Sequence, residues 1–440
     1  MRVPGLKRRP SLSRIISQKA LLKNMKTKQV ATILMSLLLA LLLYCPGAQA
    51  DQRSYHDDNN RAVQMLNQGK HKDAIELLKQ LSEKLPQNEV IRKNLQNAYL
   101  SAGIALSQKK DYQALASLML EAQEFDGKNR LFRVMSGLAL FRLNKYDEAE
   151  VNLQIARSMG EPDAQVLFML GKIFYATDRM HDAFEVLGSA RMLDSGNKAI
   201  EDMYKKVQRE LAVEQDMKKE YGRHFTITFE GNANDLLGSD VLNALEDIYS
   251  HLGSLMDYYP EQQTPVILYS RKQFKDITHS PDWSGGLYDG KIRLPIGGIE
   301  TVGKRVKQLL THEYMHVILR DIAGANIPCW LNEGLAQLSE YEQEDRKMVL
   351  FEKARRHNKL LKLAALEGSF KNYSGMHAML AYEQSYSFVR FLRDEYDWYR
   401  LQKLVFALGD GLTISEAIDR AFGEFGVNYK SLEKRWLESF

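Results

Sequence analysis

The sequence predicts a mostly α-helical protein, α+β overall, with an α-solenoid in its first half and a small β-sheet followed by helices in its second half. Three observations predict this fold class. Small residues recur every thirty-four positions up to about residue 197, which is typical of stacked helix pairs. Two short runs of β-forming residues, 225–229 and 266–269, indicate strands. From residue 342 onward the pattern is almost entirely helical.

The chain begins with a segment that is typical of exported proteins. Residues 30–45 form an uncharged apolar run, and the small residues Ala48 and Ala50 after it fit a signal-peptidase site. We therefore expect residues 1–50 to be a signal peptide, with Met25 as an alternative start. The expected location is the periplasm of a bacterial envelope. A leader that is retained would instead anchor the protein in the inner membrane.

The leader carries the positive charge of the chain. The formal net charge is +4, and the leader contains nine Lys and Arg and no acidic residue, so residues 51–440 carry −5. A negatively charged mature protein does not indicate a nucleic-acid partner. Only Cys329 follows the leader, so we expect no internal disulfide.

The first half contains an internal repeat. Glycine and alanine recur at a spacing of thirty-four, and turn residues recur between them. The repeated positions are Gly103, Gly137 and Gly171; Ala122, Ala156 and Ala190; and Leu115, Ala149 and Ala183. This pattern resembles tetratricopeptide (TPR) repeats, with four units over residues 55–197. The resemblance implies a groove that binds a protein partner, although the array could also serve only as a spacer.

A charged segment separates the repeats from the second domain. We expect residues 198–222 to be a helical linker and residues 223–440 to form the second domain. After a strand at 225–229, we expect a helix at 241–259 and a second strand. Asp289-Gly290 then predicts a hairpin turn, and Lys291 to Pro295 an edge strand that ends at a proline.

The most specific chemical signal lies at residues 312–316. His312 and His316 are four residues apart, so on a helix both imidazoles project from one face toward one metal ion. Glu313 lies beside them, where it can accept a proton from water. Catalytic zinc takes three protein ligands and an open fourth position, so a third ligand is needed.

Glu333 is the best candidate for the third ligand. Gly324, Asn326 and Pro328 end the first helix and turn the chain, and residues 330–341 again have helical spacing. Two antiparallel helices would bring Glu333 back over the histidines. Glu340, two turns further on the same face, is expected to accept a hydrogen bond from one imidazole.

The two motifs together resemble the gluzincin metallopeptidases. After His-Glu-x-x-His, the sequence Trp-Leu-Asn-Glu-Gly-Leu-Ala at 330–336 is similar to thermolysin and the aminopeptidase N family, and most similar to the peptidase MA-like branch. The resemblance implies one Zn²⁺ per chain, bound by His312, His316 and Glu333. It also implies that Glu313 is the general base.

Two further elements of the site follow from the same resemblance. The segment Tyr382–Leu392 is similar to the aminopeptidase segment that begins with a transition-state tyrosine, which implies that Tyr382 donates a hydrogen bond to the oxyanion. Tyr386, one turn away, is the rival. Gluzincins also bind their peptide substrate along an edge strand. The substrate-binding positions implied here are Lys291, Ile292, Arg293 and Leu294.

The chain departs from the aminopeptidase pattern in two places. The motif that binds the free amino group of a substrate, Gly-x-Met-Glu-Asn, is absent upstream, which favours an endopeptidase. Gln337 stands where the thermolysin-like branch has an orienting Asp, so the residue that orients the ligand stays open.

The sequence therefore predicts a periplasmic zinc-dependent metallopeptidase that cleaves protein or peptide substrates, with repeats that recruit a substrate or a regulator. The alternative is a catalytically idle peptidase fold that serves as a TPR scaffold in envelope protein assembly or quality control. The intact set of His312, Glu313, His316 and Glu333 favours the enzyme, because a buried charged cluster is costly to keep without a function.

Overall fold

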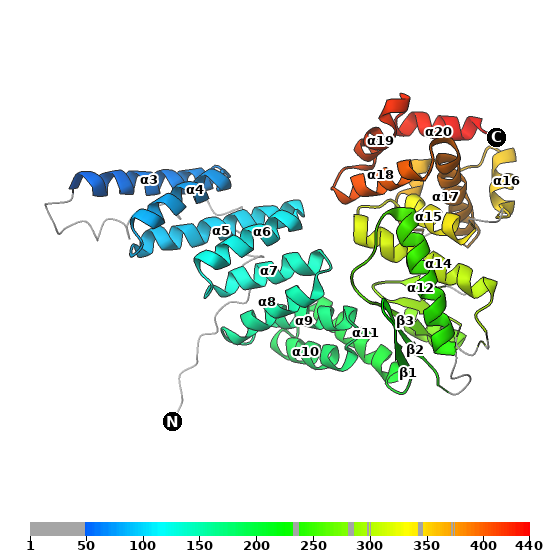
Figure 1. Cartoon of the computed structure of the whole chain (residues 1–440), viewed down its shortest axis with the longest axis horizontal. Helices are drawn as coiled ribbons and strands as arrows, with labels where there is room; N and C mark the ends of the chain where they lie inside the picture. Colours follow the sequence, from blue (N-terminus) through cyan, green and yellow to red (C-terminus); the bar gives the residue numbers. More distant parts are fainter. Residues whose placement is uncertain are drawn as a thin grey trace. The chain divides into compact units, whose positions relative to one another are not determined.

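The computed structural model describes residues 49–231, 237–279, 286–296, 299, 301–341, 346–370, 373 and 375–440. The predicted signal peptide lies outside these ranges, except for its last two residues. Within the described part, no helix combines the length and the apolar character needed to cross a membrane. The chain divides into two compact units, residues 1–175 with 179–208 and residues 176–178 with 209–440 (Figure 1).

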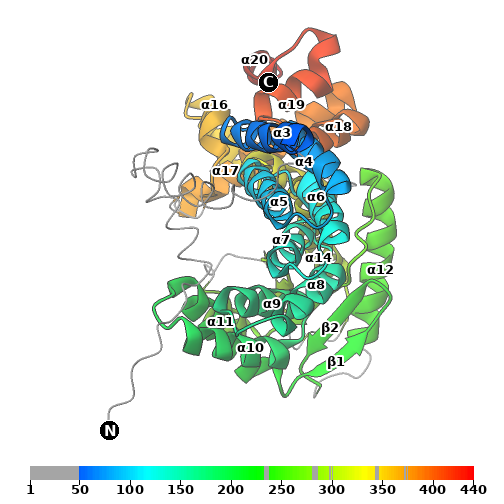
Figure 2. The same cartoon turned by 90° about the vertical axis from the view of Figure 1, so that its left-hand side faces the viewer.

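Antiparallel helix pairs build the first unit, and consecutive pairs stack in chain order (Figures 1 and 2). The α-solenoid predicted for this part of the chain is confirmed. The helices are α3 (Gln49–Asn67), α4 (His71–Lys84), α5 (Glu89–Lys109), α6 (Tyr112–Phe125), α7 (Arg130–Arg142), α8 (Tyr146–Ser158), α9 (Ala164–Ala176), α10 (Met180–Leu193) and α11 (Lys198–Glu214).

The repeated glycines let the two helices of a pair approach closely. A Cβ on Gly137 would lie 2.6 Å from Cγ of Leu153, and a Cβ on Gly171 would lie 2.6 Å from Cγ of Leu187. Cβ atoms essentially never come this close to a neighbouring atom, so a larger residue at this position would force the facing leucine to shift. The period in the sequence is therefore a period of helix packing.

The second unit contains a five-stranded sheet in the order β1-β2-β3-β5-β4. The three central strands, β2, β3 and β5, are parallel, and the outer strands β1 and β4 pair with them in antiparallel fashion. The strands are β1 (Lys218–Tyr221), β2 (Phe225–Phe229), β3 (Thr264–Leu268), β4 (Leu287–Tyr288) and β5 (Ile292–Leu294).

The prediction that residues 198–222 are helical throughout is wrong at their end. Helix α11 stops at Glu214, and Lys218–Tyr221 form β1, which pairs with β2. Charged residues are common on strands at the edge of a sheet, where they face water and block further pairing. The charge pattern of this segment is compatible with a solvated helix or an edge strand. Pairing with β2 makes it a strand.

Helices surround the sheet and continue to the end of the chain. Alternate strand residues, including Phe225 and Ile227, face the main core together with residues of α12 and α14, while Ile267 and Tyr269 face the opposite side. The helices are α12 (Leu237–Met256), α13 (Arg271–Thr278), α14 (Lys304–Ala323), α15 (Cys329–Glu340), α16 (Val349–Arg356), α17 (Gly375–Tyr396), α18 (Trp398–Gly409), α19 (Ile414–Phe422) and α20 (Tyr429–Glu438).

Candidate metal centre

Helices α14 and α15 carry the predicted metal ligands. Gly324 has a φ of +57°, which ends α14, and Pro328 precedes the first residue of α15. Helix α15 then packs against α14 on one side and α17 on the other. Gly334 makes the second contact possible, because a Cβ there would lie 2.6 Å from the backbone oxygen of Ser385 on α17.

The two histidines and Glu333 converge on one point. Nε2 of His312 and Nε2 of His316 each lie 3.7 Å from Oε2 of Glu333. One ligand atom from each of the three residues lies within 4.8 Å of the other two. Zinc bonds of about 2.0–2.2 Å in a tetrahedron place neighbouring ligand atoms about 3.4 Å apart. The two nitrogen–oxygen separations are close to this value, so the three residues fit a divalent zinc ion.

Each imidazole is oriented through its second nitrogen. Nδ1 of His312 lies 3.2 Å from Oε2 of Glu340, and Nδ1 of His316 lies 3.1 Å from Oδ1 of Asn332. The His316 contact with Asn332 has hydrogen-bond geometry, whereas His312 and Glu340 lie within ion-pair distance without that geometry. In both residues Nδ1 faces an oxygen, which leaves the Nε2 lone pairs for a metal. Glu340 was predicted for this role from the sequence, whereas Asn332 was not. The signal for Asn332 was its position directly before Glu333 in the Trp-Leu-Asn-Glu-Gly motif.

Gln337 does not orient a histidine. Its Nε2 donates to the backbone oxygen of Glu333 at 2.9 Å and to the backbone oxygen of Tyr382 at 3.1 Å. The side chain thus joins the turn of α15 that carries the third ligand to the start of the Tyr382 segment on α17. Glu340, and not residue 337, faces His312.

The charged groups of the site strongly perturb one another. Burial lowers the pKa of His312, but the carboxylates around it, led by Glu340, outweigh burial and raise the pKa to about 9. Burial raises the pKa of Glu313 to about 7. Burial and repulsion from His312 lower the pKa of His316 to about 3. Burial also raises the pKa of Glu333. Such a cluster favours the exchange of a proton for a divalent cation.

The Glu313 side chain projects from α14 toward the loop before β4. The backbone of Gly286 lies against its carboxylate, since a Cβ on Gly286 would be 2.4 Å from Oε1 and 2.8 Å from Cδ of Glu313. The Glu313 side chain is only 4% exposed. Gly286 belongs to the glycine pair that precedes the predicted hairpin, but nothing in the sequence indicated that it contacts the predicted base.

The two candidate tyrosines have different surroundings. Burial and the carboxylates of Glu333 and Glu313 raise the pKa of Tyr382, so its phenol keeps its proton and can donate a hydrogen bond. Its ring packs edge-on against Phe370 at 5.4 Å. Tyr386 is only 1% exposed, and its ring contacts Tyr341 instead.

The prediction that residues 291–295 form an edge strand is wrong. Strand β5 lies between β3 and β4, and β4 is the outer strand of the sheet as described. Both edges of β5 are therefore used for pairing. Ile292 and Leu294 face the main core and are fully buried.

Lys291 and Arg293 point to the opposite face of the sheet, because side chains alternate along a strand. Nζ of Lys291 lies 2.5 Å from Oδ1 of Asp178, and Nη2 of Arg293 lies 2.8 Å from Oε2 of Glu210. Arg293 also pairs with Asp289. These side chains are committed to buried ion pairs. Any peptide that adds to this end of the sheet would pair with β4.

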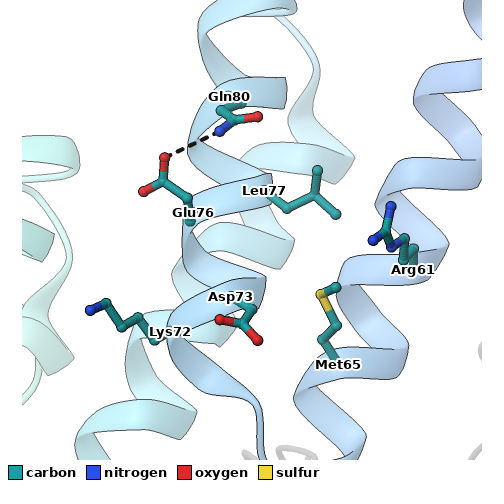
Figure 3. A pocket seen from close by; sticks show the side chains of 7 residues that line it. All are labelled: Arg61, Met65, Lys72, Asp73, Glu76, Leu77 and Gln80. Carbon is teal, nitrogen blue, oxygen red and sulfur yellow. Dashed lines mark hydrogen bonds between the residues drawn. The ribbon is translucent and has the colours of Figure 1, made fainter.

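A separate hollow lies on the first helix pair, between α3 and α4 (Figure 3). None of the predicted site residues lines it. Basic and acidic side chains are mixed around it, so the hollow shows no preference for one charge. Its lining residues include Arg61, Met65, Lys72, Asp73, Glu76 and Gln80.

One comparison with known proteins supports the peptidase MA-like domain predicted for the second half of the chain. Residues 256–440 match the model of the Peptidase MA superfamily. This region includes both helices that carry the candidate ligands and the segment that begins at Tyr382. No curated protein matches the chain.

Several solved helical-repeat structures are similar to parts of the chain. MamA from Desulfovibrio magneticus is 18% identical over 36% of this chain and 91% of its own, with a TM-score of 0.28. A thermophilic TPR protein of Thermus thermophilus is 13% identical over 35% of this chain and 98% of its own, with a TM-score of 0.24. The P58(IPK) TPR domain is 13% identical over 78% of this chain and 80% of its own, with a TM-score of 0.26.

The repeat assignment rests on the helix pairs and on their period of close packing, and the assignment of the second unit rests on the family match. Residues 256–440 therefore resemble the Peptidase MA superfamily, and they follow a TPR-like array of helix pairs.

Proposed function

We propose that this protein is a zinc-dependent peptidase that cleaves internal peptide bonds of proteins or peptides in the bacterial periplasm. The observation that carries the proposal is the convergence of three ligand atoms, Nε2 of His312, Nε2 of His316 and Oε2 of Glu333. Two imidazoles and one carboxylate leave a tetrahedral zinc ion one open position, which is the arrangement of a catalytic site.

A zinc ion bound there would supply Lewis acidity to the scissile carbonyl and to the attacking water. Glu313 accepts a proton from that water and later delivers it to the leaving amine. Its pKa of about 7 in the metal-free protein is well placed for a group that must both take up and release a proton near neutral pH. Beside a divalent cation the pKa of this carboxylate falls, which favours its basic form.

Tyr382 donates a hydrogen bond to the oxyanion of the tetrahedral intermediate. Its raised pKa keeps the phenol protonated throughout the reaction. Glu340 and Asn332 keep the two imidazoles in the tautomer that presents Nε2 to the metal. In this scheme each buried polar side chain around the site has a separate task.

Two further parts of the proposal concern access and location. The side chains of His312, His316 and Glu333 are 16%, 12% and 15% exposed, so a substrate can approach the ligands from solvent. The absence of the aminopeptidase amino-group motif favours cleavage within a chain. The predicted signal peptide supports the periplasm, and the repeats would recruit a substrate or a regulator.

Glu313→Gln tests the central assignment. This change removes the base but no metal ligand, so the purified variant should bind zinc with unchanged stoichiometry and lose turnover in a peptide-library digest read by mass spectrometry. Glu395→Gln, an exposed carboxylate on α17, is the matched control and should retain full activity. Full activity of Glu313→Gln would overturn the base assignment. A wild-type protein that binds no metal and cleaves nothing would favour the scaffold alternative.

A further inference from the structure

Helices α7 and α9 of the repeat array present two cations that rest on aromatic rings. Nζ of Lys172 lies 4.8 Å from the ring centre of Phe141 and 5.3 Å from that of Phe168. The guanidinium carbon of Arg142 lies 5.8 Å from the ring centre of Tyr112. We call these five residues the cation–aromatic face. All of them belong to the first unit.

The two cations lack the carboxylate partners that several other cations of the repeats have. Within the described residues, neither Arg142 nor Lys172 takes part in an ion pair. The paired cations of the same unit include Lys79 with Glu121, Arg92 with Asp126, Arg130 with Asp163, Arg179 with Glu150 and Arg191 with Glu201.

Lys172 is the more informative of the two cations. Its side chain is half-buried, and burial together with repulsion from Arg142 lowers its pKa. No carboxylate in the described part of the chain offsets either effect. The aromatic rings stabilise the ammonium partly and restrict its side chain, so less conformational entropy is lost when an anion binds. Two neighbouring positive charges that lack a carboxylate partner among these residues repel each other. A bound anion would offset this repulsion.

We propose that the cation–aromatic face binds an acidic segment of a partner or substrate protein, with Asp or Glu carboxylates placed at Lys172 and Arg142. Apolar side chains of the same segment would pack on Phe141 and Phe168, which are only partly buried. This inference rests on the proposed recruiting role of the repeats and does not require zinc chemistry. The partners that the array selects would be proteins with an acidic segment.

Charge favours an acidic peptide over a nucleic acid. Nucleic-acid binding depends on many phosphate contacts, and this face offers two cations. An acidic segment needs only a few charge-assisted contacts, and these are stronger where the cation is half-buried.

Fluorescence anisotropy of the whole protein tests the proposal. The probe is a fluorescein-labelled oligo-glutamate peptide that contains one phenylalanine and has an amidated C-terminus, so that only side-chain carboxylates can bind. It should bind at low ionic strength and weaken as salt is added. The same peptide with glutamine in place of glutamate should not bind. Mass spectrometry of the probe after each titration separates binding from cleavage.

Charge-neutral variants locate the site. Lys172→Gln and Arg142→Gln should each weaken binding about tenfold, the loss expected for one charge-assisted contact. Lys128→Gln is the matched control, because it removes one exposed charge from the turn between α6 and α7 and should leave binding unchanged. The combined charge reversal Arg142→Glu with Lys172→Glu should transfer the preference to an oligo-lysine peptide. Thermal melting checks that each variant is folded.

Three results would overturn the proposal. The first is no binding of the oligo-glutamate probe by the wild-type protein. The second is an equal loss of affinity in Lys128→Gln, which would indicate a general charge effect. The third is tighter binding of a single-stranded oligonucleotide with the same dependence on Lys172. Peptidase activity on a peptide without acidic residues is measured in parallel for the wild-type protein and Lys128→Gln, so failure of the enzymatic proposal can be recognised separately.

Discussion

Gly286→Ala should greatly reduce peptidase turnover while leaving the protein folded and able to bind zinc. The added Cβ would lie 2.4 Å from Oε1 of Glu313, whereas ordinary contacts begin at 3.4 Å. The carboxylate must therefore move by about 1 Å. A misplacement of that size in a reacting group can reduce the rate about 10²-fold, equivalent to about 2.7 kcal/mol in the barrier.

The cost in stability should be smaller than the cost in activity. The atoms that the new methyl group meets are the end of the flexible Glu313 side chain and Cδ2 of Leu294, at 2.9 Å. Overpacking of this kind costs about 1–2 kcal/mol. For a unit of this size, each kcal/mol lowers Tm by about 2–4 °C. The melting curve should therefore shift by only a few degrees.

The assay compares kcat on a peptide identified by the library digest, zinc content and Tm for Gly286→Ala and a control. Gly303→Ala is a suitable control, because a Cβ there meets nothing within 4 Å and its φ of −77° suits any residue. Gly303→Ala should keep near-wild-type turnover. A Gly286→Ala variant with wild-type kcat would refute the reasoning, because the position of the Glu313 carboxylate would then not matter for turnover.

Three other outcomes are expected. Glu340→Gln should weaken zinc affinity about 10–100-fold in competition with a chromogenic chelator, because it removes the charged acceptor at Nδ1 of His312; unchanged affinity would contradict this orienting role. Tyr382→Phe should lower kcat about 10²-fold, and Tyr386→Phe should have little effect; the reverse ranking would reassign the oxyanion donor. Zinc binding at about pH 7.5 should release at least one proton, because metal-free His312 has a pKa of about 9.

The raised pKa of His312 determines how zinc binding changes with pH. A raised pKa means that the metal-free protein holds the His312 proton below about pH 9, and zinc must displace it there. Zinc affinity should therefore rise with pH up to about 9, by up to about tenfold per pH unit, and then level off. Calorimetry in two buffers of different ionisation enthalpy measures the proton count. No proton release at about pH 7.5 would contradict the raised pKa.

Much of the candidate site could be predicted because it depends on helical spacing. His312 and His316 are four residues apart, and this spacing alone places them on one face of a helix. Glu333 required one more step, a turn at Gly324 and Pro328, and the breaker residues marked that turn. The thirty-four-residue period was equally visible, since each repeat buries the same small residues at the same helix contact.

Contacts between distant segments could not be predicted in the same way. Gly286 meets Glu313 only because the loop before β4 lies against α14, and nothing near Gly286 in the sequence indicates this neighbour. The charged residues of β1 fitted a helix until β2 provided a partner. The order of the strands likewise depends on pairings that are separated by many residues, so the position of β5 inside the sheet left no local trace.

The sequence by itself predicted the three candidate ligands, the candidate general base and the repeat period, because each follows from residue type and short-range spacing. Only the tertiary structure decided that residues 291–294 lie inside the sheet, that Asn332 faces His316, and that Lys172 lies between two rings without a carboxylate partner among the described residues. The physical reason is that strand order and side-chain neighbours are set by packing across the whole unit, where many local patterns are compatible with more than one arrangement.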